Sequence, residues 1–248
     1  MKKLLLAAVL AAPLVASADG GWAGSGELGF AASRGNSKSE NLNAKINFSK
    51  EDDVWKDNFY LTALRAKGNS TSIQTIDGVP TAVTRYDYTA NRYEAGASAG
   101  YKFDERSYLV GALRYENDDF SPFDYQAVLS LGYGYTAIKN ERTELSFEIG
   151  PGYKRFEPIL THETESDIVG RGLIGFKHRF NENTGFENTL LVEAGSDNTF
   201  YQNDAGLVVN MNKTLALKLG YQVRHNTDVS PGTKKTDQLM TTNLVYNF

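Results

Sequence analysis

Cysteine is absent from this 248-residue chain. Without it there can be no disulfide framework, no thiol nucleophile and no thiolate ligand for a metal. Long apolar runs are also missing after residue 18, and the mean hydropathy is −0.41. A bundle of membrane-spanning helices is therefore excluded, because each such helix needs ~20 mostly apolar residues in a row. A transmembrane β-barrel is not excluded, since only alternate residues of its strands face lipid.

The first 18 residues have the layout of a secretory signal peptide. Lys2 and Lys3 are followed by an apolar run that ends at Ala16-Ser17-Ala18. We predict cleavage after Ala18, which leaves a mature domain at 19–248. The apolar run is too short for a spanning helix, which disfavours an N-terminal membrane anchor. Without Lys2 and Lys3, 24 basic and 30 acidic residues remain, a formal charge of −6. This balance argues against nucleic-acid binding, which needs clustered Lys and Arg.

Helical periodicity is scarce after residue 18, and period two dominates instead. In ENLNAKINFSK at 40–50, Leu42, Ile46 and Phe48 alternate with Asn43 and other polar residues. This alternation predicts strands with one apolar face. About twelve such runs occur, an even number as in bacterial single-chain barrels. They lie near 23–33, 40–50, 54–66, 84–103, 108–117, 125–138, 143–156, 165–180, 185–196, 200–211, 214–226 and 236–248.

The connections between these runs alternate in length. One set is tight, as at 104–107 and 181–184, whereas the other set contains longer segments such as 67–84 and 227–235. Outer-membrane barrels have short turns on the periplasmic side and long loops outside. An even strand number then places both termini on the periplasmic side. The sequence therefore predicts an all-β, up-and-down antiparallel transmembrane barrel.

A soluble β-sandwich with its apolar face inward would show the same alternation. Two further features favour the barrel. Aromatic residues lie beside the short turns and near the long loops, as interfacial girdles do. The final residues Leu244, Tyr246 and Phe248 alternate with polar ones up to the last position, as expected for a strand that closes a barrel on the first. They also resemble the signal that outer-membrane proteins present to the barrel assembly machinery.

In a barrel the polar face of each strand surrounds the lumen. A basic residue facing lipid at mid-depth would cost roughly 2–4 kcal/mol, so the charged residues of the strands are expected to face inward. These charges either line a narrow aqueous path or pair across the lumen and plug it, and the sequence leaves both open. The predicted lumen charges are Arg92, Glu94, Lys102, Arg114, Glu116, Glu144, Glu148, Lys154, Arg171, Lys177, Glu187, Glu193, Asp204, Lys218, Arg224 and Asp237.

Some outer-membrane barrels are lipid hydrolases, in which a histidine acts as the base. His225 lies near Asp228 and Ser230 at the predicted outer rim, but Ser230 precedes Pro231 and is typical of a turn. A hydrolase using His225 is therefore the alternative function, and no catalytic residue is predicted. The acidic loop with Asp118, Asp119 and Asp124 lacks EF-hand spacing, so it is interpreted as solvated rather than as a metal site.

Several stretches resemble one known family: the segment around 91–135, EIGPGYKRF, AGSDNT and YQVRHNTDVSPGTKKTDQLMTTNLVYNF. The chain is similar over its whole mature length to a domain-of-unknown-function family whose members are labelled salt-induced outer membrane proteins. The resemblance implies the outer membrane of a Gram-negative bacterium and a link to salt or osmotic stress. It brings no catalytic residue, ligand or transported solute.

We therefore predict a monomeric, non-enzymatic outer-membrane barrel that either passes ions or small polar solutes or serves the envelope. No cofactor and no metal are expected. The predicted partners are outer-membrane lipids, lipopolysaccharide and, through the C-terminal strand, the assembly machinery. A weaker alternative is a periplasmic β-sandwich that binds a ligand.

Overall fold

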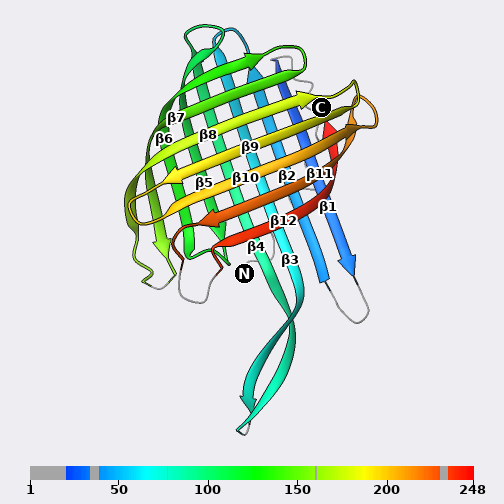
Figure 1. Ribbon diagram of the computed structural model, residues 1–248, viewed down its shortest axis with the longest axis vertical. Helices are drawn as coiled ribbons and strands as arrows, with labels where there is room; N and C mark the ends of the chain where they lie inside the picture. The colour runs from blue at the N-terminus through cyan, green and yellow to red at the C-terminus, as the bar shows by residue number, and fades with distance from the viewer. Residues whose placement is uncertain (1–20, 34–38, 77, 160, 230–233) are drawn as a thin grey trace.

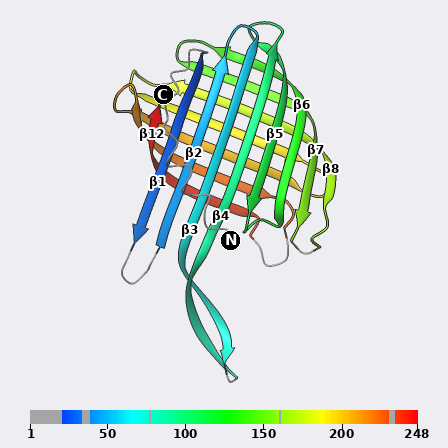
Figure 2. The same cartoon turned by 180° about the vertical axis from the view of Figure 1, so that it is seen from behind.

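The computed structural model describes residues 21–33, 39–76, 78–159, 161–229 and 234–248, so the predicted signal peptide lies outside the described residues. The chain forms a closed antiparallel barrel in which consecutive strands are neighbours and β1 pairs with β12 (Figures 1 and 2). The strands are β1 (Trp22–Ser33), β2 (Ser39–Glu51), β3 (Trp55–Ile76), β4 (Val79–Lys102), β5 (Ser107–Asp118), β6 (Phe123–Lys139), β7 (Thr143–Pro158), β8 (Glu165–Arg179), β9 (Thr184–Ala194), β10 (Thr199–Asn210), β11 (Leu215–Asn226) and β12 (Thr236–Asn247). The predicted all-β barrel of twelve antiparallel strands is confirmed, and the β-sandwich alternative is wrong.

The five short connections are built in the same way. Each begins with an Asp or Asn whose side-chain oxygen accepts hydrogen bonds from the backbone N–H groups two and three residues later. This is the Asx turn, in which a short side chain takes the place of a backbone acceptor. The five residues are Asp52, Asp104, Asn140, Asn181 and Asn212. Because all five turns lie at one end of the barrel, this end is called the short-turn end, and the opposite one the long-loop end.

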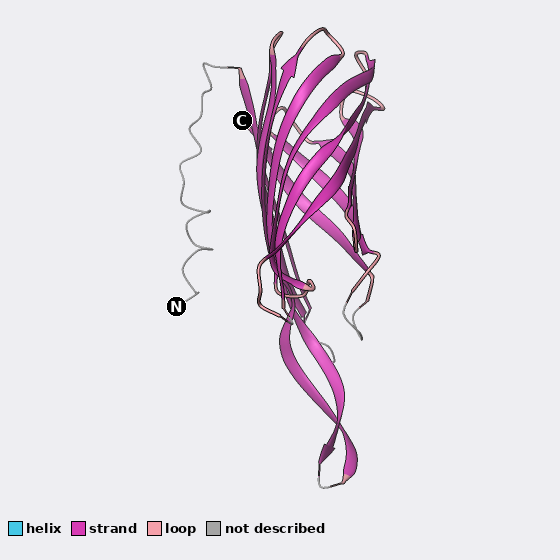
Figure 3. Ribbon diagram, turned by 90° about the vertical axis from the view of Figure 1, so that its left-hand side faces the viewer, coloured by secondary structure: helices cyan, strands magenta, loops and turns pink. Residues whose placement is uncertain are grey.

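One predicted loop is wrong. The segment 67–84 was expected to be a long connection, but β3 and β4 continue through it as a twisted two-stranded arm that projects beyond the barrel wall (Figures 1 and 3). A register shift between Ala66 and Lys67 marks the point where the arm leaves the wall. The arm is rich in β-branched residues, and Thr71 and Thr84 share a cross-strand hydrogen bond of 2.9 Å. Its tip carries Gly78 at φ 79°, a conformation that glycine adopts without strain.

The two faces of the wall differ in chemistry. On β5, Leu113 and Tyr115 are about half exposed on the outside, whereas Arg114 and Glu116 between them are buried inside. The same alternation exposes large apolar side chains around the outer wall, including Phe30, Leu129, Ile149 and Ile168 at 60–72%. The apolar face therefore points away from the lumen. Among the described residues, no helix is long and apolar enough to cross a membrane.

Candidate functional site: the charged lumen

The most deeply buried charges form one layer across the lumen in its long-loop half. The Arg114 guanidinium on β5 binds both carboxylate oxygens of Glu193 on β9, with Nε 3.0 Å from Oε1. Its Nη1 lies 2.9 Å from Oε2 of Glu116 on the same strand. Glu116 also accepts from Arg224 on β11 at 2.5 Å. These four side chains, Arg114, Glu116, Glu193 and Arg224, are called the charge layer.

The charge layer joins opposite walls of the barrel. In the closed strand order β5 and β11 lie on opposite sides. Arg224 crosses this span to reach Glu116, and its Nη1 is 3.0 Å from Oδ2 of Asp118 at the end of β5. The exposed fractions are 1% for Glu116, 2% for Glu193 and 7% for each arginine. The charge layer is thus almost without solvent contact, and it crosses the lumen at this level.

Aromatic and amide groups surround the charge layer. The ring of Phe200, which is 1% exposed, lies 5.1 Å from the Arg114 guanidinium and 5.0 Å from that of Arg224, within cation–π range. Gln126 donates to Glu116 at 3.0 Å. These contacts help to hold the charged groups in place.

Gly96 leaves space for the Tyr60 ring, which holds the carboxylate of Glu94 beside the charge layer. Tyr60 donates to Oε1 of Glu94 at 2.6 Å. A Cβ at Gly96 would lie 2.2 Å from the Tyr60 ring, so only glycine leaves this ring its place. The buried Glu94 carboxylate is therefore held by a neutral donor at the edge of the charge layer.

A second set of ion pairs lies nearer the short-turn end. Lys218 on β11 bridges Glu27 on β1 at 2.8 Å and Glu187 on β9 at 2.6 Å. On another part of the wall, Arg171 pairs with Glu148 at 2.9 Å. Each of these groups connects nearby strands rather than opposite walls. They line the lumen without crossing it.

A third group lies at the rim of the short-turn end. Glu51 accepts from Lys102 at 2.8 Å and from Lys139 at 2.7 Å. Burial alone would raise the pKa of Glu51, but these two ammonium donors outweigh it and lower the pKa to about 2. In the adjacent turn, the backbone N–H groups of Trp55 and Val54 lower the pKa of Asp52. The carboxylates of Glu51 and Asp52 are thus stabilised in their ionised form.

The predicted lumen residues are distributed unevenly among these groups. The charge layer contains four of the predicted residues, and Arg92 and Glu94 adjoin it. Within the described part of the chain, Lys177 and Asp237 have no ion pair and are exposed. Lys154 is buried against the rings of Phe123 and Phe156.

The sequence reasoning missed several members of the lumen. Glu27 and Lys56 carry ion pairs, and Phe200 fills the space between two arginines. Glu27 is in phase with the inward-facing Gly29, so the period-two pattern alone would have found it. Phe200 gave no such signal, because an inward-facing aromatic cannot be told from a girdle residue by its type.

The setting of His225 does not assemble a catalytic group among the described residues. Its Nδ1 lies 2.8 Å from Oγ1 of Thr236, and its ring packs 6.0 Å from that of Tyr201. No carboxylate of the described chain bonds to this imidazole. Ser230, the serine near His225 in the sequence, lies outside the described residues. The contacts present are those of a residue that joins neighbouring strands.

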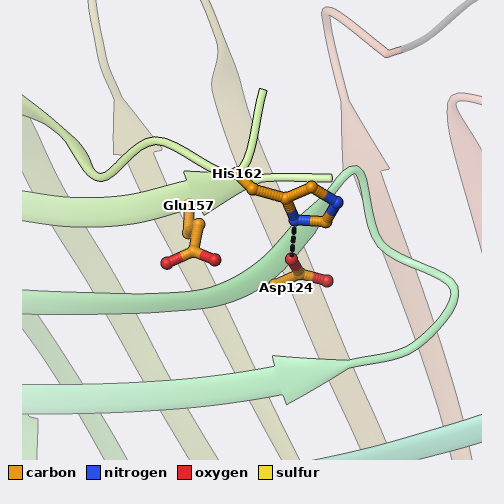
Figure 4. A group of neighbouring side chains, drawn as sticks. All are labelled: Asp124, Glu157 and His162. Atoms are coloured by element: carbon orange, nitrogen blue, oxygen red, sulfur yellow. Dashed lines mark hydrogen bonds and ion pairs between the residues drawn. The ribbon is translucent and has the colours of Figure 1, made fainter. Parts of the chain in front are cut away.

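The acidic loop residues separate in the structure. Asp118 turns inward to Arg224, and Asp119 accepts from Asn91 at 2.6 Å. Asp124 instead lies 2.8 Å from Nδ1 of His162, whose φ is 53° (Figure 4). Ligand atoms of Asp124, Glu157 and His162 all lie within 4.8 Å of one another, so these three could hold a divalent ion. His162 is exposed, whereas Asp124 and Glu157 are partly buried, and the His162–Asp124 hydrogen bond already occupies one ligand atom each of His162 and Asp124.

The family model described as "Protein of unknown function, DUF481" matches residues 26–248. The chain belongs to this family. It is 24% identical over 233 residues to the uncharacterised protein YdiY of Escherichia coli (strain K12), covering 94% of this chain and 85% of that protein. This assignment agrees with the sequence resemblance and leaves the activity of the family open.

Several solved barrels resemble the fold at 10–11% sequence identity. The similarity to the NanC porin covers 91% of this chain and 97% of the porin chain, with a TM-score of 0.46. The similarity to the translocator domain of the autotransporter NalP from Neisseria meningitidis covers 92% of this chain and 87% of that domain, with a TM-score of 0.48. The similarity to an outer membrane channel from Pseudomonas putida F1 covers 91% of this chain and 94% of the channel, also with a TM-score of 0.48. At this level of similarity nothing follows from them about what the present chain binds or conducts.

Proposed function

We propose that the protein is a non-enzymatic barrel of the bacterial outer membrane whose lumen is a narrow path for ions or small polar solutes, with the charge layer as its constriction. The placement in a membrane rests on the outer wall. Apolar side chains such as Ile149 and Ile168 are 72% and 68% exposed with nothing packed against them. Soluble monomers rarely expose so continuous an apolar surface, whereas a lipid-facing wall requires it.

The single observation that carries the proposed path is the charge layer itself. Burying ion pairs is costly, and well-packed apolar residues of similar size would often serve stability as well or better. A barrel that acted only as an envelope component would have no need of arginines crossing its lumen. A path for ions does need charged groups at its narrowest point, because they set which ions pass and whether any do.

The same proposal orients the barrel. The short-turn end would face the periplasm with both termini, and the arm of β3 and β4 would extend outside, toward lipopolysaccharide. At the C-terminus, Phe248 exchanges two backbone hydrogen bonds with Gly24, while Leu244 and Tyr246 face outward. This closing strand would be the segment read by the assembly machinery. A role under salt or osmotic stress is part of the proposal, and its only support is the resemblance of the sequence.

Conductance of the refolded protein in a planar bilayer tests the path. The wild-type barrel should give small or rare current steps, because the charge layer crosses the axis. Arg224→Ala removes the side chain that joins opposite walls and should increase the conductance or the frequency of openings. Lys139→Ala is the matched control, since it removes a paired cation at the rim and leaves the charge layer intact. Closed traces at all voltages for all three proteins would rule out the path.

A further inference from the structure

The β1–β12 seam is the only seam among the described strands that is paired over a short stretch. Its paired residues extend only from Ser25↔Asn247 to Leu28↔Leu244. Toward the short-turn end, the backbone of Gly24 is hydrogen-bonded to that of Phe248. By contrast, β1 pairs with β2 along its whole length, and β12 pairs with β11 up to Thr236. Residues 29–33 of β1 and 236–243 of β12 therefore each have a partner strand on one side only.

Unpaired strand edges are costly in a membrane. Backbone N–H and C=O groups have no hydrogen-bond partner in hydrocarbon, which is why spanning barrels close fully. The free stretch begins above Leu28 and Leu244, which are about half exposed on the apolar outer wall. It therefore starts within the lipid-facing wall of the proposed membrane barrel. The backbone N–H and C=O groups of these edges therefore need polar hydrogen-bond partners at that level.

An unsatisfied acceptor lies on the lumen side at the point where pairing stops. Asn243 is 6% exposed, and its Nδ2 donates to Glu27 at 3.1 Å. Its Oδ1 accepts no hydrogen bond from any described group. A Cβ on Gly29 would lie 2.2 Å from this Oδ1, so the oxygen approaches β1 only because residue 29 is glycine. Lys218 bonds to the same Glu27, so both charge signs and a free acceptor meet at the seam.

On the outer side of the free stretch, two large apolar side chains stand beside the exposed Gln238 and Thr242 of β12. Phe30 on β1 is 69% exposed and Met240 on β12 is 82% exposed. The inward-facing Ala31 and Asp237 are also exposed, whereas Gly29, Asn243 and Val245 near the paired half are buried. The free stretch thus carries exposed apolar side chains on its outer side and, toward the long-loop end, exposed residues on its lumen side.

The charge layer crosses the axial route beside this stretch. Arg224 lies opposite Asp237 in the β11–β12 register, at the long-loop end of the free edge. Its ion pair with Glu116 crosses the lumen there. A molecule that enters from the short-turn end would meet the charge layer ahead of it and a wall without backbone hydrogen bonds at its side.

We propose that the β1–β12 seam is a lateral portal that passes a single-chain amphiphile between the lumen and the surrounding membrane leaflet. The polar head would lie near Glu27, Asn243 and Lys218, and the alkyl chain would emerge between Phe30 and Met240. This proposal rests on the membrane placement proposed above, and it adds a substrate class that axial conductance does not require.

Tryptophan quenching tests the portal in lipid vesicles. In a Trp22→Phe, Trp55→Phe background, Thr241→Trp places a reporter on the lumen side of the seam. Thr62→Trp is the matched control, because Thr62 is also inward-facing and half-buried but has paired strands on both sides. The quencher is a lysophosphatidylcholine with a nitroxide on its acyl chain. Quenching should be strong at position 241 and weak at position 62, and equal quenching would overturn the proposal.

Closing the seam gives a second test, which a cysteine-free chain makes simple. Phe30→Cys and Thr242→Cys stand where continued register would bring β1 and β12 together. Joining them with a short thiol cross-linker should abolish the quenching of the position-241 reporter. Gly26→Cys with Tyr246→Cys is the control pair, since these residues are already paired and a Cβ at Gly26 meets no atom. Quenching that persists in the closed seam would contradict the portal.

The two proposals fail separately. If quenching differs as expected but no variant conducts, the portal stands and the axial path falls. If Arg224→Ala conducts while positions 241 and 62 are quenched alike, the path stands and the portal falls. If the protein does not enter vesicles and neither reporter is quenched, the membrane placement itself is wrong, and both fall.

Discussion

The charge layer and the short-turn rim use the same kinds of side chain at different depths. In the charge layer, Arg114 and Glu193 are nearly inaccessible to water, and each partner depends on the other. At the rim, the side chains of Glu51 and Lys139 are 32% and 51% exposed. Water can replace a lost partner at the rim but not in the charge layer. The energetic cost of losing one partner of an ion pair is therefore determined by the burial of the pair. The N···O distance does not determine it, because this distance is similar in both places.

The largest expected effect is the loss of one partner in the charge layer. Arg114→Ala leaves Glu193 and Glu116 buried with fewer donors, and breaking a buried pair in this way costs about 3–5 kcal/mol. The free energy of unfolding, measured by urea titration of the protein in vesicles, should fall by that amount. Lys139→Ala is the control and should cost less than about 1 kcal/mol. Equal losses would mean that the charge layer is solvated.

Replacing a whole pair separates stability from function. Arg114→Met combined with Glu193→Leu removes both charges and fills similar volume, so stability should recover to within about 1 kcal/mol of wild type or exceed it. Ion preference in the planar bilayer should nevertheless change. A double variant as unstable as Arg114→Ala would show that the pair contributes to folding in its own right.

The turns give a smaller effect at the opposite end of the barrel. Asn181→Ala removes two hydrogen bonds to the backbone N–H groups of Asn183 and Thr184, each 2.9 Å long. The expected loss is about 1 kcal/mol in the same urea titration. Asn181→Asp keeps an acceptor oxygen and should lose less. An alanine variant as stable as wild type would mean that the register of β8 and β9 alone sets the turn.

The smallest effect is the pH dependence of the rim. Because the pKa of Glu51 is lowered from 4.5 to about 2 in the folded state, its stabilisation is complete above pH 4.5 and is lost as the pH falls toward 2. Partial exposure limits it to roughly 1 kcal/mol. Glu51→Gln should remove this part of the loss between pH 7 and pH 3. Glu182→Gln, in another short turn, should not.

The strands were predictable because period two records which face of a strand meets water. The run at 108–117 became β5 with an error of one residue at each end, and the turns that begin at Asp104 and Asn181 lie where short connections were expected. The arm was missed because its Gly, Ser and Asn residues are typical of loops. Its Asp-Gly dipeptide and β-branched residues nevertheless favour the hairpin that the structure contains.

The pairing of the lumen charges could not be predicted. Alternation places Arg114 and Arg224 on the inner face, but only closure of the barrel brings β11 opposite β5. The same holds for Asp118, interpreted as a solvated loop residue and found bound to Arg224. The register of the seam is also a long-range property, because it depends on how far the first and last strands diverge.

By itself, the sequence determined the local features of this protein: which residues face in or out, where Asx turns reverse the chain, and how many strands it can form. Each of these depends on neighbours a few residues away. The tertiary structure decided which charges are buried together, that Arg224 and Glu116 pair across the lumen, and that the β1–β12 seam is unpaired above Leu28. Those depend on strands far apart in the chain, where small differences in tilt and register determine which groups meet.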